Sequence, residues 1–152
     1  MSELFMAFDP SSSLSKAFYT IEPFELEFLA MEPEVIQVST SSIEQYLSSR
    51  PFTAAFAENE AWLEVGGNCY VVGFLAREHF CGNQALRVLK YERAVPKVLA
   101  MVGAIAAKKR LPQAFELELG ILLPYGEYKD GERFESLVAV ALSDFSFRGR
   151  RY

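Results

Sequence analysis

The chain has 152 residues, of which 51% are hydrophobic and 14% aromatic, enough to build one domain with a buried core and too apolar for a disordered segment. No apolar run approaches the ~18–20 residues that cross a bilayer, and the first residues lack the pattern of a signal peptide. Cys69 and Cys81 are the two cysteines, which excludes a disulfide scaffold. We therefore expect a cytoplasmic protein without membrane contact. The net charge of −5 argues against direct nucleic-acid binding.

Charge is unevenly distributed along the chain. Residues 1–64 contain eleven acidic and two basic side chains, whereas the remaining residues contain nine acidic and thirteen basic ones. Such a dipolar surface favours head-to-tail self-association into a dimer or a filament. Charges scattered over solvated faces would give the same counts, and the sequence leaves both interpretations open.

The first third of the chain predicts three antiparallel strands followed by a helix. The apolar run 3–8 and the alternating run 16–21 flank a polar turn, and residues 24–30 alternate again. Ser41 with Glu44 three residues later has the pattern of a capping box. A short helix with Ser41 as its N-cap is therefore expected, ending at about Ser48.

The middle of the chain predicts a hairpin and a long helix. Two β-rich runs flank Gly66 and Gly67, which can adopt positive φ, so residues 60–74 are expected to form a hairpin that is a small subdomain or insertion. Residues 75–86 show no period and are interpreted as a loop. Residues 87–110 carry apolar side chains at helical spacing and predict the longest helix.

The last third predicts an inner strand, a helix and the start of a final strand. The run 115–123 is apolar enough to be buried on both faces, Asp130 could cap the helix, and residues 145–147 begin the last strand. The arginines of 148–151 are expected to form an exposed, solubilising end. The order β-β-β-α-ββ-α-β-α-(β) predicts a single α/β domain over residues 1–152, with helices packed on one mixed sheet.

The turn between the first two strands has the composition of a phosphate site. It contains one acid, a lysine and a row of small hydroxyl residues: Asp9, Ser11, Ser12, Ser13 and Lys16. Backbone N–H groups and small side chains in a tight turn can wrap an anion, a lysine adds positive charge, and an aspartate can hold Mg²⁺. An ordinary serine-rich hairpin turn uses the same residues, and their spacing alone leaves both interpretations open.

Three stretches resemble one known family. The turn resembles the first phosphate loop of the actin/Hsp70/hexokinase superfamily through the pattern Asp9-x-Ser11-Ser12-Ser13-x-x-Lys16. Residues 62–73 resemble a hairpin of the plasmid-partition branch, the ParM or StbA type of actin-like ATPase. Residues 122–130 resemble its Leu-Pro-x-x-Glu-Tyr-x-Asp signature. The resemblance covers nearly the whole chain and implies an RNase H-like fold, half of an actin-type fold.

The resemblance also implies a chemistry. ATP and Mg²⁺ would be the cofactors, and the full-length protein would form filaments that segregate plasmids, with a DNA-bound adaptor protein as a partner. Asp9 would act on Mg²⁺ and Lys16 on the β- and γ-phosphates, as the catalytic pair. The remaining cofactor-binding residues would be Ser11, Ser12, Ser13 and Glu127.

The sequence departs from the family in two ways. Ser11 stands where the family has glycine, whose missing Cβ lets the backbone approach a phosphate. The second nucleotide-binding domain, with the hydrolytic glutamate, would lie beyond Tyr152. We therefore expect this half to bind ATP and Mg²⁺ weakly or not at all, and to hydrolyse ATP slowly if at all. Whether the chain is an enzyme is left open.

Two other functions are compatible with the sequence. A domain of this fold could be a non-catalytic protein-interaction module. Alternatively, Asp9, Glu44 and Glu118 could bind two metal ions and make a metal-dependent nuclease. His79 and Cys81 lie two residues apart, but a metal site needs more ligands at workable spacing than the sequence offers there.

Overall fold

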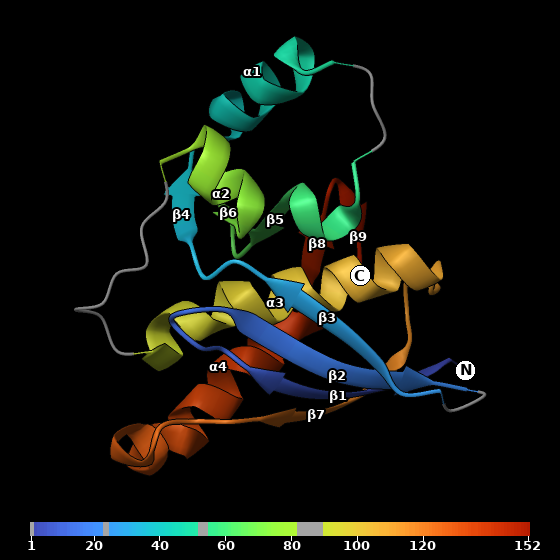
Figure 1. Ribbon diagram of the computed structural model, residues 1–152, viewed down its shortest axis with the longest axis vertical. Coiled ribbons are helices and arrows are strands. Elements are labelled where there is room, and N and C mark those ends of the chain that lie inside the picture. The colour runs from blue at the N-terminus through green and yellow to red at the C-terminus, as the bar shows by residue number, and fades with distance from the viewer. Residues whose placement is uncertain (1, 23–24, 52–54, 82–89) are drawn as a thin grey trace.

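The computed structural model describes residues 2–22, 25–51, 55–81 and 90–152. These residues form a mixed α/β fold with two sheets and four α-helices (Figure 1). The expected α/β class with a mixed sheet is confirmed, whereas the expectation of a single sheet is wrong. Within the described part of the chain, no helix is long and apolar enough to cross a bilayer.

Sheet A has four strands in the order β3-β2-β1-β7. Its strands are β1 (Glu3–Asp9), β2 (Ser15–Ile21), β3 (Glu27–Met31) and β7 (Glu116–Ile121). Strand β1 pairs antiparallel with β2 and parallel with β7, and β2 pairs antiparallel with β3. The three predicted opening strands are thereby confirmed. Because parallel neighbours cannot be joined by a tight turn, the chain leaves this sheet after β3 and returns to it through a long helix.

Sheet B has five antiparallel strands in the order β4-β6-β5-β8-β9. Its strands are β4 (Val35–Val38), β5 (Ala61–Val65), β6 (Asn68–Val72), β8 (Phe145–Phe147) and β9 (Arg150–Arg151). The predicted hairpin is confirmed as β5-β6, and Gly66 and Gly67 turn the chain with φ of 57° and 79°. Strand β4 was not predicted, because its four residues, which begin two positions after Pro33, carry too short a pattern.

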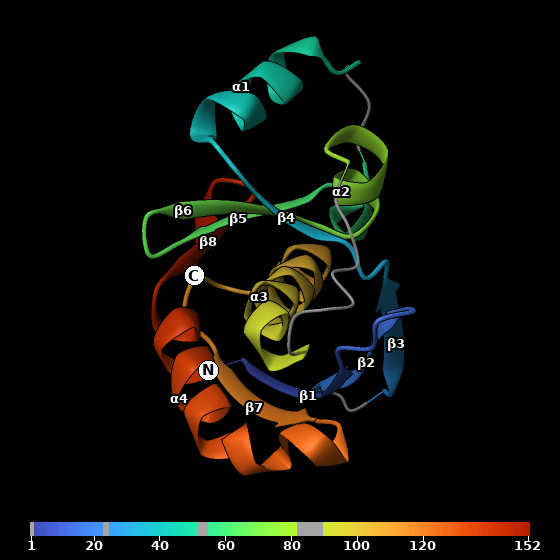
Figure 2. The same ribbon diagram turned by 90° about the vertical axis from the view of Figure 1, so that its left-hand side faces the viewer.

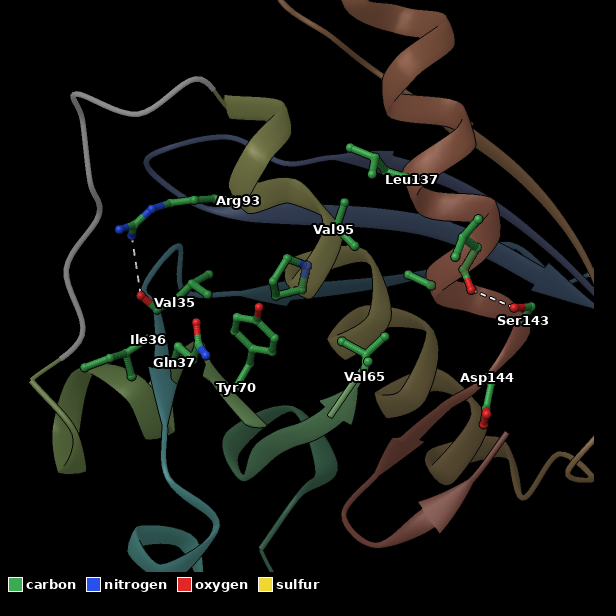
Figure 3. A pocket seen from close by; sticks show the side chains of 14 residues that line it. Val35, Ile36, Gln37, Val65, Tyr70, Arg93, Val95, Leu137, Ser143 and Asp144 are labelled. Atoms are coloured by element: carbon green, nitrogen blue, oxygen red, sulfur yellow. Dashed lines mark hydrogen bonds between the residues drawn. The ribbon is translucent and has the colours of Figure 1, made fainter. Parts of the chain in front are cut away.

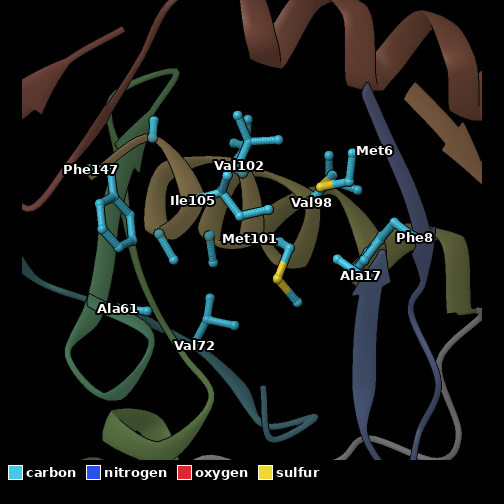
Figure 4. Close-up of a cluster of buried hydrophobic side chains, with 14 of the residues drawn as sticks. Met6, Phe8, Ala17, Ala61, Val72, Val98, Met101, Val102, Ile105 and Phe147 are labelled. Atoms are coloured by element: carbon cyan, nitrogen blue, oxygen red, sulfur yellow. The ribbon is translucent and has the colours of Figure 1, made fainter. Parts of the chain in front are cut away.

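Helix α3 (Lys90–Lys109) lies between the two sheets (Figure 2). The middle of this helix is buried on all sides, and its residues 98–106 include the most buried side chains of the protein. Figure 4 shows Val98, Met101 and Ile105 between side chains of sheet A and sheet B. The predicted long helix is confirmed from residue 90 onward, and residues 87–89 lie outside the described part. The side of α3 that faces sheet B carries small residues, alanine and glycine, which let this sheet approach the helix closely.

The other helices lie at the two ends of the molecule. Helices α1 (Thr40–Ser49) and α2 (Phe74–His79) lie beyond sheet B, and α4 (Gly131–Ser143) packs against α3 (Figure 2). Two short 3-10 helices are η1 (Ala57–Asn59) and η2 (Tyr125–Asp130). Helix α2 occupies most of the described part of the segment that was interpreted as a loop, which corrects that prediction.

Two predicted helix caps differ from the structure. Helix α1 is capped by Ser39 rather than Ser41, since the Ser39 hydroxyl accepts a hydrogen bond from the Ser42 amide at 3.2 Å. The two choices lie two residues apart in a run of hydroxyl side chains. Asp130 does stand at the N-cap of α4, but its side chain makes no capping hydrogen bond.

Strand β7 is an edge strand and not the inner strand that was predicted. On one face Leu117, Leu119 and Ile121 are half-buried, whereas Glu116, Glu118 and Gly120 on the other face are exposed. The prediction failed because the following strand, β8, joins sheet B and pairs with β5 instead of extending sheet A beyond β7.

Arg150 and Arg151 are exposed, as expected, and Arg148 is half-buried, but each of these arginines also has a partner on the domain. Arg148 donates to Oε1 of the buried Glu60 at 3.1 Å. Arg150 donates to the Leu111 carbonyl at 2.8 Å, and Arg151 forms an ion pair with Asp144. The short β8-β9 pair fixes these side chains at the edge of sheet B.

Candidate phosphate-binding turn

The turn between β1 and β2 lies where the two parallel strands of sheet A end. Asp9 is the last residue of β1, and the amide of Leu122, just after β7, donates to the Phe8 carbonyl at 2.9 Å. Glu127 follows in η2, at the same end of the sheet as the turn (Figure 1). The carboxyl ends of parallel strands are where open α/β sheets bind ligands. The expected site residues Asp9 and Glu127 therefore belong to one edge of the sheet.

Asp9 and Lys16 stand opposite each other at the mouth of the turn. They are Cα partners in the antiparallel pair of β1 and β2. Their neighbours Phe8 and Ala17 are completely buried in the core, so Asp9 and Lys16 face the opposite, outer side of the sheet. Both side chains are half-buried, and no ion pair between them occurs in the described structure. Each charge is therefore available to a ligand.

The serines of the turn are partly occupied by one another. The Ser11 Oγ accepts a hydrogen bond from the Ser13 amide at 3.3 Å and lies 3.1 Å from the Ser13 Oγ. Ser11 and Ser12 are half-buried, and Ser13 is exposed. Just beyond the turn, the buried Ser15 Oγ has no hydrogen-bond partner within the residues described. The turn is a compact polar structure with its hydroxyl groups near the surface.

The structure adds a site residue that sequence reasoning missed. Lys97 of α3 is only 6% exposed, and its ammonium lies beneath the turn, with Nζ 3.5 Å from the Ser11 carbonyl oxygen. Lys16 stands at the end of the turn on the outer face of sheet A, whereas Lys97 reaches the turn from α3, which packs on the inner face. A sequence signal existed, because Lys97 is the only charged residue between positions 94 and 107.

The carboxylates proposed for a nuclease are not brought together. Glu118 is the Cα partner of Phe5, four positions before Asp9 on the same strand, a rise of about 13 Å. Glu44 belongs to α1, on the far side of sheet B. In the described ranges, no group of three His, Cys, Asp or Glu side chains could hold a metal ion. The structure gives the nuclease hypothesis no site.

His79 and the two cysteines also form no site. The His79 ring packs on the half-buried Tyr46 with centroids 5.2 Å apart, so its partner is an aromatic side chain. Cys69 is buried in sheet B, as expected for a core cysteine, and burial raises the pKa of its thiol to about 11. Cys81 is exposed, and both thiols are free.

A groove of about 760 Å³ opens between sheet B, the first half of α3 and the end of α4 (Figure 3). Exposed Leu137 and Val140 of α4 form one wall, and Tyr70 of β6 lies in its floor. Arg93 stands at one end, where it donates to the Val35 carbonyl at 3.4 Å. No residue of the β1-β2 turn lines this groove, so it is separate from the candidate phosphate site.

The candidate site is therefore defined by geometry. Comparisons of the chain with protein-family models, curated proteins and solved structures find no match. The turn at the end of the parallel strand pair unites four features: an aspartate, three serines, a lysine on the outer face and a buried lysine beneath.

Proposed function

We propose that this chain is the nucleotide-binding lobe of an actin-like protein and that its β1-β2 turn holds the phosphates of Mg²⁺–ATP. One observation supports this function best: the buried Lys97 lies beneath the serine turn, and Lys16 stands at the end of this turn on the outer face of sheet A. Two positive charges beside backbone amides create an attractive potential for a polyphosphate in a chain whose net charge is −5.

Each residue of the turn has a chemical role in this proposal. Lys16 binds the β- and γ-phosphate oxygens as a point charge. Amides and hydroxyls of Ser12 and Ser13 donate hydrogen bonds to phosphate oxygens. Asp9 holds Mg²⁺ through water molecules, since Mg²⁺ sites in proteins use one or two carboxylates together with substrate phosphates.

The topology supports the actin-like, RNase H-like part of the proposal. Three antiparallel strands, a short helix, the β5-β6 hairpin, a long helix and a strand parallel to the first follow one another in the order expected from the resemblance, to which β4, α2 and the second sheet are additions. In the proposed arrangement a second lobe closes the nucleotide pocket. This lobe alone is therefore expected to bind weakly and to hydrolyse ATP slowly if at all. Assembly into filaments and recruitment of a DNA-bound adaptor would be functions of the complete protein.

Isothermal titration with Mg²⁺–ATP tests the proposal. Wild type should bind at high micromolar to millimolar ligand, and Lys16→Met should lose at least about fivefold in affinity, because it removes a charge-assisted contact. Asp9→Asn should lower the affinity for Mg²⁺–ATP more than the affinity for ATP in EDTA. Lys108→Met is the matched control, since it removes one positive charge at the exposed end of α3.

The Lys108→Met control distinguishes binding at the turn from a general electrostatic attraction between ATP and the lysines of the protein. If Lys108→Met weakens binding as much as Lys16→Met does, the turn is not the site. If wild type gives no heat at millimolar ATP, the nucleotide-binding function is wrong.

A second candidate function, a non-catalytic protein-interaction module, is favoured by the groove beside α4. Its wall carries Leu137 and Val140, which are 44% and 74% exposed. Apolar surface of this kind at a groove is typical of protein contacts. Absence of ATP binding by wild type would leave this function as the better interpretation.

A further inference from the structure

The Ser11 hydroxyl occupies a hydrogen-bond donor that a phosphate would need. The Ser13 amide donates to the Ser11 Oγ at 3.3 Å, and the two hydroxyl oxygens of Ser11 and Ser13 lie 3.1 Å apart. Without a ligand, the Ser13 amide of the turn is therefore already hydrogen-bonded within the turn.

A hydroxyl oxygen and a phosphate oxygen compete for the same N–H group. An amide donates one good hydrogen bond, and sharing it between two acceptors weakens both. A phosphate that approaches Ser13 must either displace the Ser11 hydroxyl or bind without this donor. Because Ser11 is only half-buried, its side chain has room to move toward solvent.

The backbone of Ser11 is held independently of its side chain. Lys97 donates to the Ser11 carbonyl from beneath the turn, while the Ser11 side chain reaches Ser13 within the turn. Rotation about the χ1 angle of Ser11 can therefore free the Ser13 amide without moving the backbone. The opening step is a single rotamer change rather than a rearrangement of the loop.

We infer that the Ser11 side chain is a built-in competitor of the phosphate, which keeps the ligand-free turn closed on itself and sets its affinity for polyphosphate anions. This inference rests on the proposed function and adds a residue that determines how tightly the site binds. A net hydrogen bond to an amide has a modest value, so its removal from the ligand-free state should tighten binding about two- to tenfold.

Titration of three proteins with Mg²⁺–ATP and with inorganic triphosphate tests the inference. Ser11→Ala removes the competing hydroxyl and should bind both ligands about two- to tenfold more tightly than wild type. Ser11→Thr restores a hydroxyl at the same position and should return the affinity to within about twofold of wild type. The turn is at the surface, and the amide NMR spectrum of each variant checks that the fold is retained.

An independent readout follows the hydrogen bond itself. The Ser13 amide should exchange with solvent faster in Ser11→Ala than in wild type or Ser11→Thr. If the Ser13 amide is released but Ser11→Ala binds no more tightly than wild type, the inference is wrong and the proposed function stands. If wild type and both variants bind neither ligand, the proposed function is wrong and the inference falls with it.

Discussion

Phe147 of β8 packs directly on Gly103 of α3. A Cβ built on Gly103 would lie 2.6 Å from Cδ2 of the Phe147 ring, closer than real side chains approach. Phe147 is 1% exposed, and Figure 4 shows its ring beside α3. This contact holds the end of the chain against the central helix and explains a glycine in the middle of a buried helix.

Gly103→Ala should therefore destabilise the protein, although alanine is the better helix former. Overpacking costs about 1–3 kcal/mol, and the gain in helix propensity offsets up to about 1 kcal/mol of that. We expect a net loss of about 1–2 kcal/mol in the free energy of unfolding, measured by urea denaturation.

Gly131, the first residue of α4, provides the matched control for this substitution. A Cβ there would meet only the Leu123 Cδ1 at 4.0 Å, so Gly131→Ala should leave stability unchanged or raise it by up to about 1 kcal/mol. Equal effects at the two positions would contradict the packing explanation.

Among the buried charged residues, Glu60 should be the one whose substitution lowers the free energy of unfolding most. Its side chain is 3% exposed and contacts the guanidinium groups of Arg50 and Arg148 and the hydroxyl of Tyr46. Glu60→Gln leaves two guanidinium groups without their counter-charge, and we expect a loss of about 3 kcal/mol in urea denaturation. A loss under about 1 kcal/mol would show that the cluster does not hold α1 and the β8-β9 pair to the domain.

Asp144→Asn, which removes an exposed ion pair, provides the comparison with the buried Glu60. Asp144 pairs with Arg151, but their side chains are 61% and 75% exposed. Exposed pairs of this kind contribute less than about 1 kcal/mol, so this substitution should change the urea midpoint only slightly.

Alkaline pH should weaken the fold through Tyr19. Burial, followed by the hydrogen bond that Tyr19 donates to Glu27, raises the pKa of the Tyr19 hydroxyl from 10.0 to about 12. Because the folded state holds the proton more tightly, this contribution to stability is complete below pH 10 and declines as the pH rises toward 12.

The measurement is the urea midpoint at pH 9 and at pH 11.5 for wild type and Tyr19→Phe. Wild type should lose more stability across this interval than the variant does. Cys69, whose pKa burial raises to about 11, titrates in the same range in both proteins and cancels from the comparison. Equal losses in the two proteins would contradict the assignment to Tyr19.

The two thiols should differ in reactivity. Cys81 is exposed, whereas Cys69 is buried in sheet B and its raised pKa disfavours the reactive thiolate. A chromogenic disulfide reagent at pH 8 should label one thiol rapidly in the folded protein and both thiols in urea. Rapid labelling of Cys81→Ser in the folded state would show that sheet B opens readily.

Local patterns predicted the opening strands and the β5-β6 hairpin, because alternation and the Gly66–Gly67 turn are properties of neighbouring residues. The second sheet could not be predicted in this way. It depends on β4 and β8, which are short, and on pairing between β5 and β8, whose partners lie 80 to 84 residues apart. Helix α3 could also be predicted only in part. Its large apolar residues indicate one buried face, but the sequence does not show that the face carrying alanines is buried as well.

The candidate site was predicted in part. The sequence indicated Asp9, the serines and Lys16, since all belong to one hairpin, and the register places the two charged residues opposite each other. The lone charge of Lys97 between positions 94 and 107 was a signal, but the sequence did not show that Lys97 reaches Ser11, 86 residues away, through tertiary packing. Nor could it show that the Ser11 hydroxyl takes the Ser13 amide, because that depends on the conformation of the turn.

The most direct test of the account is a map of amide chemical shifts during titration of the ¹⁵N-labelled protein with Mg²⁺–ATP. The account predicts that Ser12, Ser13 and Lys16 shift first and most, while Gly66 and Gly67 at the far hairpin stay unchanged. Shifts centred instead on the groove beside α4, at Tyr70 and Val140, or no shifts at millimolar ligand, would contradict the claim that the β1-β2 turn binds a nucleotide.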